Sequence, residues 1–159
     1  MKSMLLLLAV GILRLPFFVS HPSDFIDPTG TYILKGTKKN TRILGHSGEL
    51  RVKLLTPKKV AMCFYINKGY PGYESGSFLD TLAYDDNLVK FIPKNDGDCS
   101  IIFCFSDYAA EIRQVYRNPQ SSCGFGEGIL VSAFFEKSSE ERPIIQDLSS
   151  HGISPTISP

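Results

Sequence analysis

Glu74 and Asp80 are the carboxylates that come closest to forming a pair for acid–base hydrolysis. Such a mechanism needs two carboxyl groups at a fixed separation, and nothing in the sequence between these residues fixes one. Asp80 also alternates with the apolar residues Phe78 and Leu82, so two placements are open. Facing inward, the carboxyl would have a raised pKa unless it is hydrogen-bonded. Facing outward, which we favour, it is a surface acid. A hydrolase is therefore the less favoured hypothesis.

Few residues suit nucleophilic or metal chemistry. Of the three histidines, only His46 lies where an ordered site could form, and a solvated turn histidine is the simpler interpretation, because a nucleophile needs an adjacent base. The chain has neither an HExxH motif nor a CxxC pair, so we expect no metal site and no cofactor. The glycine-rich run 123–128 precedes an apolar, strand-like segment instead of the helix that a phosphate loop requires.

A loop over residues 67–76 is the best candidate for recognition. It is longer than a tight hairpin needs, and it places Tyr70, Pro71, Tyr73 and Glu74 among glycines. Tyrosine is favoured at recognition surfaces because it offers a large contact area and a polar hydroxyl at a small entropic cost. The alternative is that the tyrosines fold back over the end of the domain. These four residues are our candidate binding loop.

The elements that must position this loop are predicted to be β-strands. In residues 48–54, charged side chains alternate strictly with Leu50, Val52 and Leu54, which is typical of a half-buried strand. Turn-forming residues separate the other apolar runs at short intervals. The expected strands cover residues 30–35, 48–54, 60–66, 77–84, 88–93, 99–106, 108–117 and 128–137.

An antiparallel meander is the simplest arrangement of about eight consecutive strands with short connections. Closing the meander into a barrel removes its two open edges. We therefore predict the all-β fold class, with a β-barrel domain over residues 30–137. A two-sheet β-sandwich is the alternative.

The first twenty residues are typical of a secretory signal peptide. Lys2 precedes an apolar run over residues 4–13, which is shorter than the stretch of about 20 residues that a membrane span needs. We predict a signal helix in residues 1–20, a linker in 21–29 and no stable membrane span after cleavage. A buried N-terminal helix and an uncleaved anchor are the alternatives. The serine-rich residues 138–159 are predicted to be a disordered tail.

Composition and charge exclude several classes of protein. The 159-residue chain has 17 Lys and Arg against 16 Asp and Glu, and 43% of its residues are hydrophobic, as in a globular domain. Removing residues 1–20 changes the formal charge from +1 to −1, so no nucleic acid is expected as a partner. The expected location is secreted or periplasmic.

The four cysteines indicate disulfide formation in an exported chain. Cys99 begins one expected strand and Cys123 precedes another, which puts both at the same end of the domain. Strands two apart are separated by about 10 Å, whereas a disulfide needs Cα atoms within about 7 Å. The loop before Cys123 must therefore fold inward. We predict a Cys99–Cys123 disulfide and expect Cys63 and Cys104 to be unpaired.

Three segments together resemble a known group of proteins: residues 30–32 (GTY), 76–84 (GSFLDTLAY) and 123–126 (CGFG). They are similar to small secreted bacterial proteins, common in Bacteroidetes, that are mostly uncharacterised and look lipocalin-like. The resemblance covers about residues 30–137 and implies a lipocalin-like barrel. Cysteines at the start of a late strand and in the CGFG motif recur in that group, which matches Cys99 and Cys123. The resemblance implies no particular activity.

These observations favour a secreted, non-catalytic binding protein that binds, or inhibits, another protein through its loops. The alternative is a lipocalin-like carrier of a small apolar ligand. An eight-stranded barrel has room for at most one such ligand, and large inward side chains favour a filled interior. The partner is thus an unknown protein or a small apolar ligand.

Overall fold

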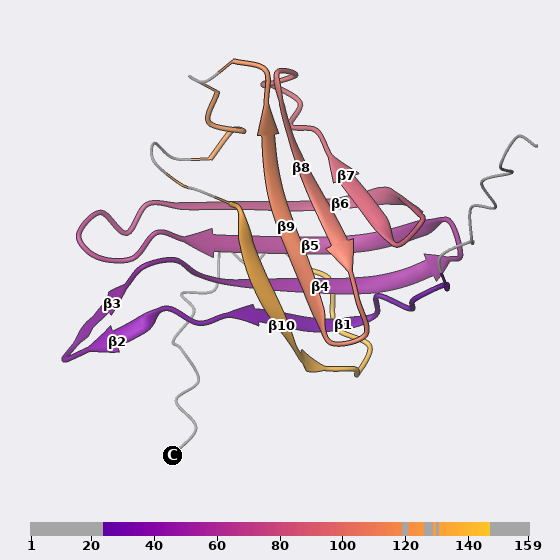
Figure 1. The fold of residues 1–159 in the computed structure, drawn as a ribbon, viewed down its shortest axis with the longest axis horizontal. Coiled ribbons are helices and arrows are strands. Elements are labelled where there is room, and N and C mark those ends of the chain that lie inside the picture. Colours follow the sequence, from indigo (N-terminus) through magenta and orange to yellow (C-terminus); the bar gives the residue numbers. More distant parts are fainter. Residues whose placement is uncertain (1–23, 119–120, 126–128, 130, 147–159) are drawn as a thin grey trace, which may run out of the picture.

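The computed structural model describes residues 24–118, 121–125, 129 and 131–146. The predicted signal helix in residues 1–20 and the end of the predicted tail, residues 147–159, lie outside the described residues. All named elements are β-strands (Figure 1). Within the described residues, no helical segment has the length and apolar character of a membrane span.

Eight strands form one closed antiparallel barrel. They are β1 (Gly30–Leu34), β4 (Ser47–Thr56), β5 (Lys59–Asn67), β6 (Ser75–Asp85), β7 (Leu88–Phe91), β8 (Cys99–Phe105), β9 (Ala109–Tyr116) and β10 (Ala133–Ser139). From β4 to β10 each strand pairs with the next along the chain, and β1 closes the barrel between β10 and β4. The predicted meander barrel is confirmed, and the sandwich alternative is wrong.

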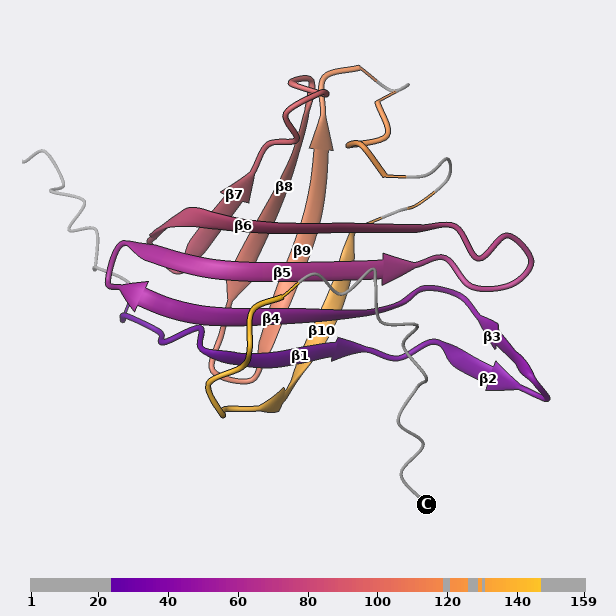
Figure 2. The same cartoon turned by 180° about the vertical axis from the view of Figure 1, so that it is seen from behind.

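A short hairpin interrupts the meander between β1 and β4. It consists of β2 (Thr37–Lys39) and β3 (Arg42–Leu44), which pair only with each other. The amino-acid pattern does not predict this hairpin, because β2 is exposed on both sides and shows no alternation of apolar and polar residues. Figure 1 and Figure 2 show the hairpin projecting from the barrel at the same end as the loop between β5 and β6. We call this end of the barrel the loop end.

Strict alternation in β4 gives the barrel its inner and outer faces. Leu50 and Val52 are fully buried and lie opposite Phe64 and Met62 of β5, whereas Arg51 between them faces outward. Alternation of this kind places every second side chain in the core. The same pattern holds in β8, where every odd-numbered residue from Cys99 to Phe105 is buried.

Aromatic side chains fill the interior around Phe64. Its ring centroid lies 5.6 Å from that of Phe78, 5.7 Å from those of Phe103 and Phe135, and 6.1 Å from that of Phe125. These residues come from β6, β8, β10 and the segment after β9. A single fully buried ring therefore connects both halves of the barrel wall.

The N-terminal segment closes the end of the barrel opposite the loop end. The Tyr84 hydroxyl donates a hydrogen bond to the carbonyl of Ile26 (2.6 Å), and the Asn87 carboxamide accepts one from the Ile26 N–H (2.9 Å). Asn87 also donates to the Asp24 carbonyl (2.8 Å), and the Phe25 ring meets Tyr84 edge-on. Residues 24–28, predicted as a linker, are thus held against the barrel by Tyr84 and Asn87.

Burial of Tyr84 predicts a loss of stability at alkaline pH. Desolvation raises the pKa of Tyr84 from 10.0 to about 12. Between these values the unfolded chain has lost a proton that the folded chain keeps, so the free energy of unfolding falls as the pH rises from 10 to 12. Urea midpoints measured at pH 8 and pH 11.5 are expected to fall more for the native chain than for Tyr84→Phe, which has no phenol to ionise. An equal fall in both proteins would contradict this assignment.

The segment after β10 lies on the outside of the barrel. β10 runs to Ser139, two residues beyond the expected domain end at Lys137, so residues 138 and 139 are strand and not tail. Figure 2 shows the following segment crossing the outer face of β1 and β4. Arg51 donates a hydrogen bond to the Ile144 carbonyl (3.4 Å). Cys63, on the outward side of β5, is 0% exposed, and the backbone of Gln146 contacts its thiol.

This cover predicts a difference in reactivity between the two free thiols. Burial raises the pKa of both free thiols, but the Cys63 thiol has no exposed surface, whereas Cys104 is half-buried. We expect the native protein to react with one equivalent of a thiol reagent at pH 8, at Cys104, and Cys63 to react at least about tenfold more slowly. Removal of residues 140–159 is expected to abolish the difference. Equal rates in the full chain would show that residues 140–146 do not cover Cys63.

Candidate binding surface at the loop end

The predicted loop over residues 67–76 is shorter in the structure, where residues 68–74 connect β5 to β6 and are held in one shape by hydrogen bonds. The Gly69 N–H donates to the side chain of Asn67 (2.7 Å), whose carboxamide donates to the Tyr73 carbonyl (2.8 Å). The Tyr73 N–H donates in turn to the Gly69 carbonyl (2.8 Å). Asn67, the last residue of β5, therefore fixes both ends of the loop from a rigid element of the barrel.

The β2–β3 hairpin supports this loop from the side. The Tyr70 N–H donates to the Ile43 carbonyl (2.7 Å), and Tyr70 forms an isolated parallel bridge with Leu44. The backbones approach so closely at Gly69 that a Cβ there would lie 2.4 Å from the Gly45 carbonyl oxygen. Gly69 also has a φ of +76°, which favours glycine. The loop and the hairpin thus form one continuous surface.

Tyr70 and Tyr73 stand exposed on this surface and do not fold back into the barrel. They are 40% and 45% exposed, and their rings meet edge to face with centroids 6.3 Å apart. The guanidinium carbon of Arg42, on β3, lies 4.2 Å from the centroid of the Tyr70 ring. This distance is typical of a cation–π contact. We call Arg42, Tyr70 and Tyr73 the tyrosine platform.

Glu74 stabilises the base of the loop. Its carboxylate lies 2.8 Å from the Lys68 ammonium group, and this hydrogen-bonded contact lowers the pKa of Glu74. The backbone N–H of Lys68 donates to the Glu74 carbonyl as well (3.0 Å). Pro71, at the tip, is exposed and follows a cis peptide bond from Tyr70. Of the four predicted loop residues, the tyrosines present surface and Glu74 supports it.

Asp80 lies on the inward-facing side of β6 and not on the outer side that we favoured. It is half-buried and opposite Met62 of β5. Its carboxylate accepts a hydrogen bond from the backbone N–H of Thr81 (2.7 Å). β7 pairs with β6 only at Tyr84 and Asp85, so this N–H lies on a stretch of β6 that β7 does not reach. The Asp80 carboxylate therefore provides a hydrogen-bond acceptor for a backbone N–H at an unpaired strand edge.

The carboxylate pair considered for hydrolysis does not form a site. Six steps along a nearly extended chain separate Glu74 from Asp80, which corresponds to about 20 Å. Paired carboxylates of glycosidases lie about 5–10 Å apart. Glu74 is engaged by Lys68 and Asp80 by the backbone of Thr81, as described above.

Other groups in the described residues do not converge on a chemical site. No cluster of three or more potential metal ligands occurs among them. Nε2 of His46 is buried without a hydrogen-bond partner in the described part of the chain. Clefts at the surface of the described residues include one of about 400 Å³ and one of about 310 Å³. The larger is lined by residues 107, 108 and 137–141, and the smaller by residues 25, 57, 58 and 84–87. Neither is lined by Asp80, Glu74 or Phe64.

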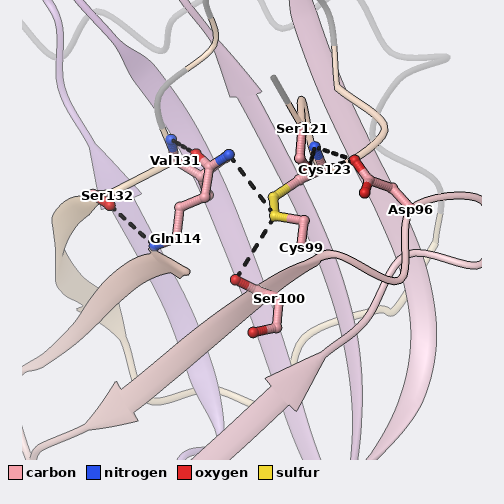
Figure 3. Close-up of a disulfide and its surroundings, with 8 residues drawn as sticks. All are labelled: Asp96, Cys99, Ser100, Gln114, Ser121, Cys123, Val131 and Ser132. Carbon is pink, nitrogen blue, oxygen red and sulfur yellow. Dashed lines mark hydrogen bonds between the residues drawn. A yellow bond between two sulfur atoms is a disulfide. The ribbon is translucent and has the colours of Figure 1, made fainter. Parts of the chain in front are cut away.

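A disulfide joins the start of β8 to the segment after β9 at this end of the barrel. Cys99 and Cys123 are bonded, with Cα atoms 5.2 Å apart, which confirms the predicted pair. The segment before Cys123 folds inward because Asp96 accepts hydrogen bonds from the Ser121 hydroxyl (2.5 Å) and the Cys123 N–H (3.1 Å) (Figure 3). On the other side Gln114 donates to the Cys99 sulfur (3.9 Å). Cys63 and Cys104 are free thiols.

The part of the surface that sequence reasoning missed is Arg42 with the β2–β3 hairpin. Asn40, with a φ of +57°, and Thr41 form the two-residue connection between these strands. Asparagine readily adopts this conformation in tight hairpins. Asn40 is therefore the residue in the sequence that could have indicated a turn here. The contact of Arg42 with Tyr70, 28 positions further along the chain, has no signal in a single sequence.

Comparison of the chain with models of known protein families, with curated proteins and with solved structures finds no match.

Proposed function

We propose that this protein is an exported, non-catalytic binding protein that engages another protein through the tyrosine platform. The observation that supports this most directly is the contrast between the two places where aromatic side chains gather. Inside the barrel they pack against one another around Phe64, whereas Tyr70 and Tyr73 are exposed on a loop whose backbone is already ordered. A preordered loop loses little conformational entropy when it binds.

Tyrosine and arginine are also the residue types that contribute most to protein–protein binding. The platform combines one arginine and two tyrosines on a surface supported by two neighbouring elements. This composition supports a protein partner better than it supports a small apolar ligand.

The carrier hypothesis has less support, because a small apolar ligand needs an apolar cavity of about 300 Å³ or more. Two surface clefts in the described residues are bordered by charged side chains such as Lys137 and Lys58. The interior side chains around Phe64 contact one another across the barrel. A ligand at that position would have to displace packed rings.

Export is part of the proposal and is supported by two features. The Cys99–Cys123 disulfide is of the kind that persists in oxidising compartments. The charged start and short apolar run of residues 1–20 are typical of a signal peptide. We propose a secreted or periplasmic location.

A capture experiment with matched variants tests the function. The chain from residue 21 onward is immobilised and exposed to the secreted and envelope proteins of its source cells, and the bound proteins are identified by mass spectrometry. The test variant is Tyr70→Ala with Tyr73→Ala. The control is Tyr108→Ala with Tyr116→Ala, because these tyrosines are also exposed but lie outside the platform.

We expect at least one partner that the native chain and the control variant bind and the test variant loses. Retention of every partner by the test variant would overturn the assignment of the platform. A measured hydrolytic activity that survives purification and depends on Asp80 or Glu74 would overturn the non-catalytic part.

A further inference from the structure

The β2–β3 hairpin carries a concentration of positive charge that the near-neutral chain as a whole does not show. Lys38, Lys39 and Arg42 lie on the hairpin and Lys35 lies just before it, all within eight residues, and no acidic residue occurs between Asp27 and Glu49. All four cationic side chains are exposed. Asp24, Asp27, Asp85 and Asp86 belong to the N-terminal segment and the β6–β7 turn at the opposite end, and Glu74 at the loop end is already engaged by Lys68.

Lys39 and Arg42 lie opposite each other on the hairpin, and none of the ion pairs in the described residues includes either of them. Lys39 and Arg42 are direct cross-strand partners, so their side chains leave the hairpin on the same side. Like charges in this arrangement destabilise a strand pair. The ion pairs among the described residues involve Arg51, Lys58, Lys68 and Arg113, and none of them includes Lys38, Lys39 or Arg42. The repulsion is relieved when an anion binds between the two side chains.

The position of Arg42 over Tyr70 prepares it to bind an anion. A guanidinium group that covers an aromatic ring presents its N–H groups in its own plane, toward the rim of the ring. Donors in this plane match the two oxygens of a carboxylate. Because the Tyr70 backbone is hydrogen-bonded to Ile43 of the same hairpin, the residue that carries the ring is held beside the residue that carries the guanidinium. Lys39 stands beside this group as a second cation.

We propose that the partner of the tyrosine platform binds through an acidic segment, with carboxylates placed between Lys39 and Arg42 and apolar atoms on Tyr70 and Tyr73. This inference rests on the proposed function and specifies the chemistry of the partner. A protein segment is favoured over a phosphate polymer or a membrane because the cations occupy one short hairpin and the formal charge of the whole chain is only +1. Polyanions and anionic membranes are bound by more extended arrays of cations.

The first test uses simple probes and the full chain from residue 21, labelled with ¹⁵N. The probes are an acetylated octamer of glutamate and the corresponding octamer of glutamine, followed by NMR at low salt. We expect the glutamate octamer to shift resonances of residues 37–44 and 69–74, the glutamine octamer to shift none, and 0.5 M NaCl to reverse the shifts. Absence of shifts with glutamate, or shifts spread evenly over the barrel, would overturn the inference.

Charge reversal supplies the matched variants. Lys39→Glu with Arg42→Glu is expected to weaken glutamate binding at least about tenfold. Lys90→Glu with Lys94→Glu changes the net charge equally at exposed sites away from the hairpin and is expected to leave binding unchanged. Circular dichroism checks that both variants keep the barrel. Equal weakening by both variants would mean that net charge alone is responsible, and it would overturn the assignment to Lys39 and Arg42.

Two further arms separate the alternatives. The probes are inorganic polyphosphate and vesicles of phosphatidylcholine and phosphatidylglycerol at a ratio of about 7:3. If either probe binds and the glutamate octamer does not, the hairpin binds a phosphate-bearing polyanion or a membrane, and our inference is overturned. The variants also separate the two proposals. A captured partner could be lost by Tyr70→Ala with Tyr73→Ala but bind Lys39→Glu with Arg42→Glu at unchanged affinity. That result would leave the proposed function intact and overturn only the inference that the partner is acidic.

Discussion

Replacement of Phe64 by alanine is expected to lower the free energy of unfolding by about 3–5 kcal/mol. Phe64 is 0% exposed, and its ring meets four other aromatic rings that come from separate parts of the barrel wall. The substitution removes these contacts and leaves a cavity that the rigid wall cannot fill. Urea denaturation followed by circular dichroism measures the change, and the same slope with a lower midpoint indicates a loss of stability alone.

Phe134→Ala is the matched control for this prediction. Phe134 is on β10 next to the buried Phe135, but it faces outward and is 52% exposed. An exposed phenylalanine contributes little to the core, so we expect a change within about 0.5 kcal/mol. If the two substitutions lowered the stability equally, the interior would not be organised around Phe64.

Loss of the Cys99–Cys123 disulfide is expected to lower the free energy of unfolding by about 3 kcal/mol. The bond closes a loop with a sequence separation of 24 residues, and most of its effect comes from restricting the unfolded chain. The double variant Cys99→Ala with Cys123→Ala should show this loss in thermal or urea denaturation without a reductant.

The reductant itself provides the control. Tris(carboxyethyl)phosphine should destabilise the native chain by the same amount and should leave the double variant unchanged, because Cys63 and Cys104 are free thiols in the native chain. A further loss of stability in the double variant on reduction would show that the remaining cysteines pair when Cys99 and Cys123 are absent.

The barrel could be predicted because its strands carry their burial pattern locally. In β4 the charged and apolar residues alternate, and Leu50 and Val52 are fully buried as expected. The predicted bounds of the last strand were less accurate, because β10 begins at Ala133 and ends at Ser139 instead of covering 128–137. Its first expected residues lie partly outside the described part of the chain. The hairpin was missed because β2 is exposed on both sides and so has no burial pattern.

The candidate site was predictable only in its most local part. Tyr70 and Tyr73 were recognised from residue type and from loop length, and both are exposed. Asn67 supports them locally, but their support by Ile43 and Arg42 depends on contacts between segments far apart in the chain. The inward turn at Cys123 similarly depends on Asp96, 27 positions earlier. Such contacts follow from the closed topology and cannot be read from a single segment.

The clamp on residues 24–28 has a practical consequence for handling the protein. Tyr84 and Asn87 hold this segment at the end of the barrel opposite the hairpin and the tyrosine platform. A tag, bead or surface joined upstream of Asp24 therefore leaves the platform facing the solution. A linker placed in the β5–β6 loop would instead occupy it. Sensor chips for affinity measurements should accordingly be loaded through the amino terminus.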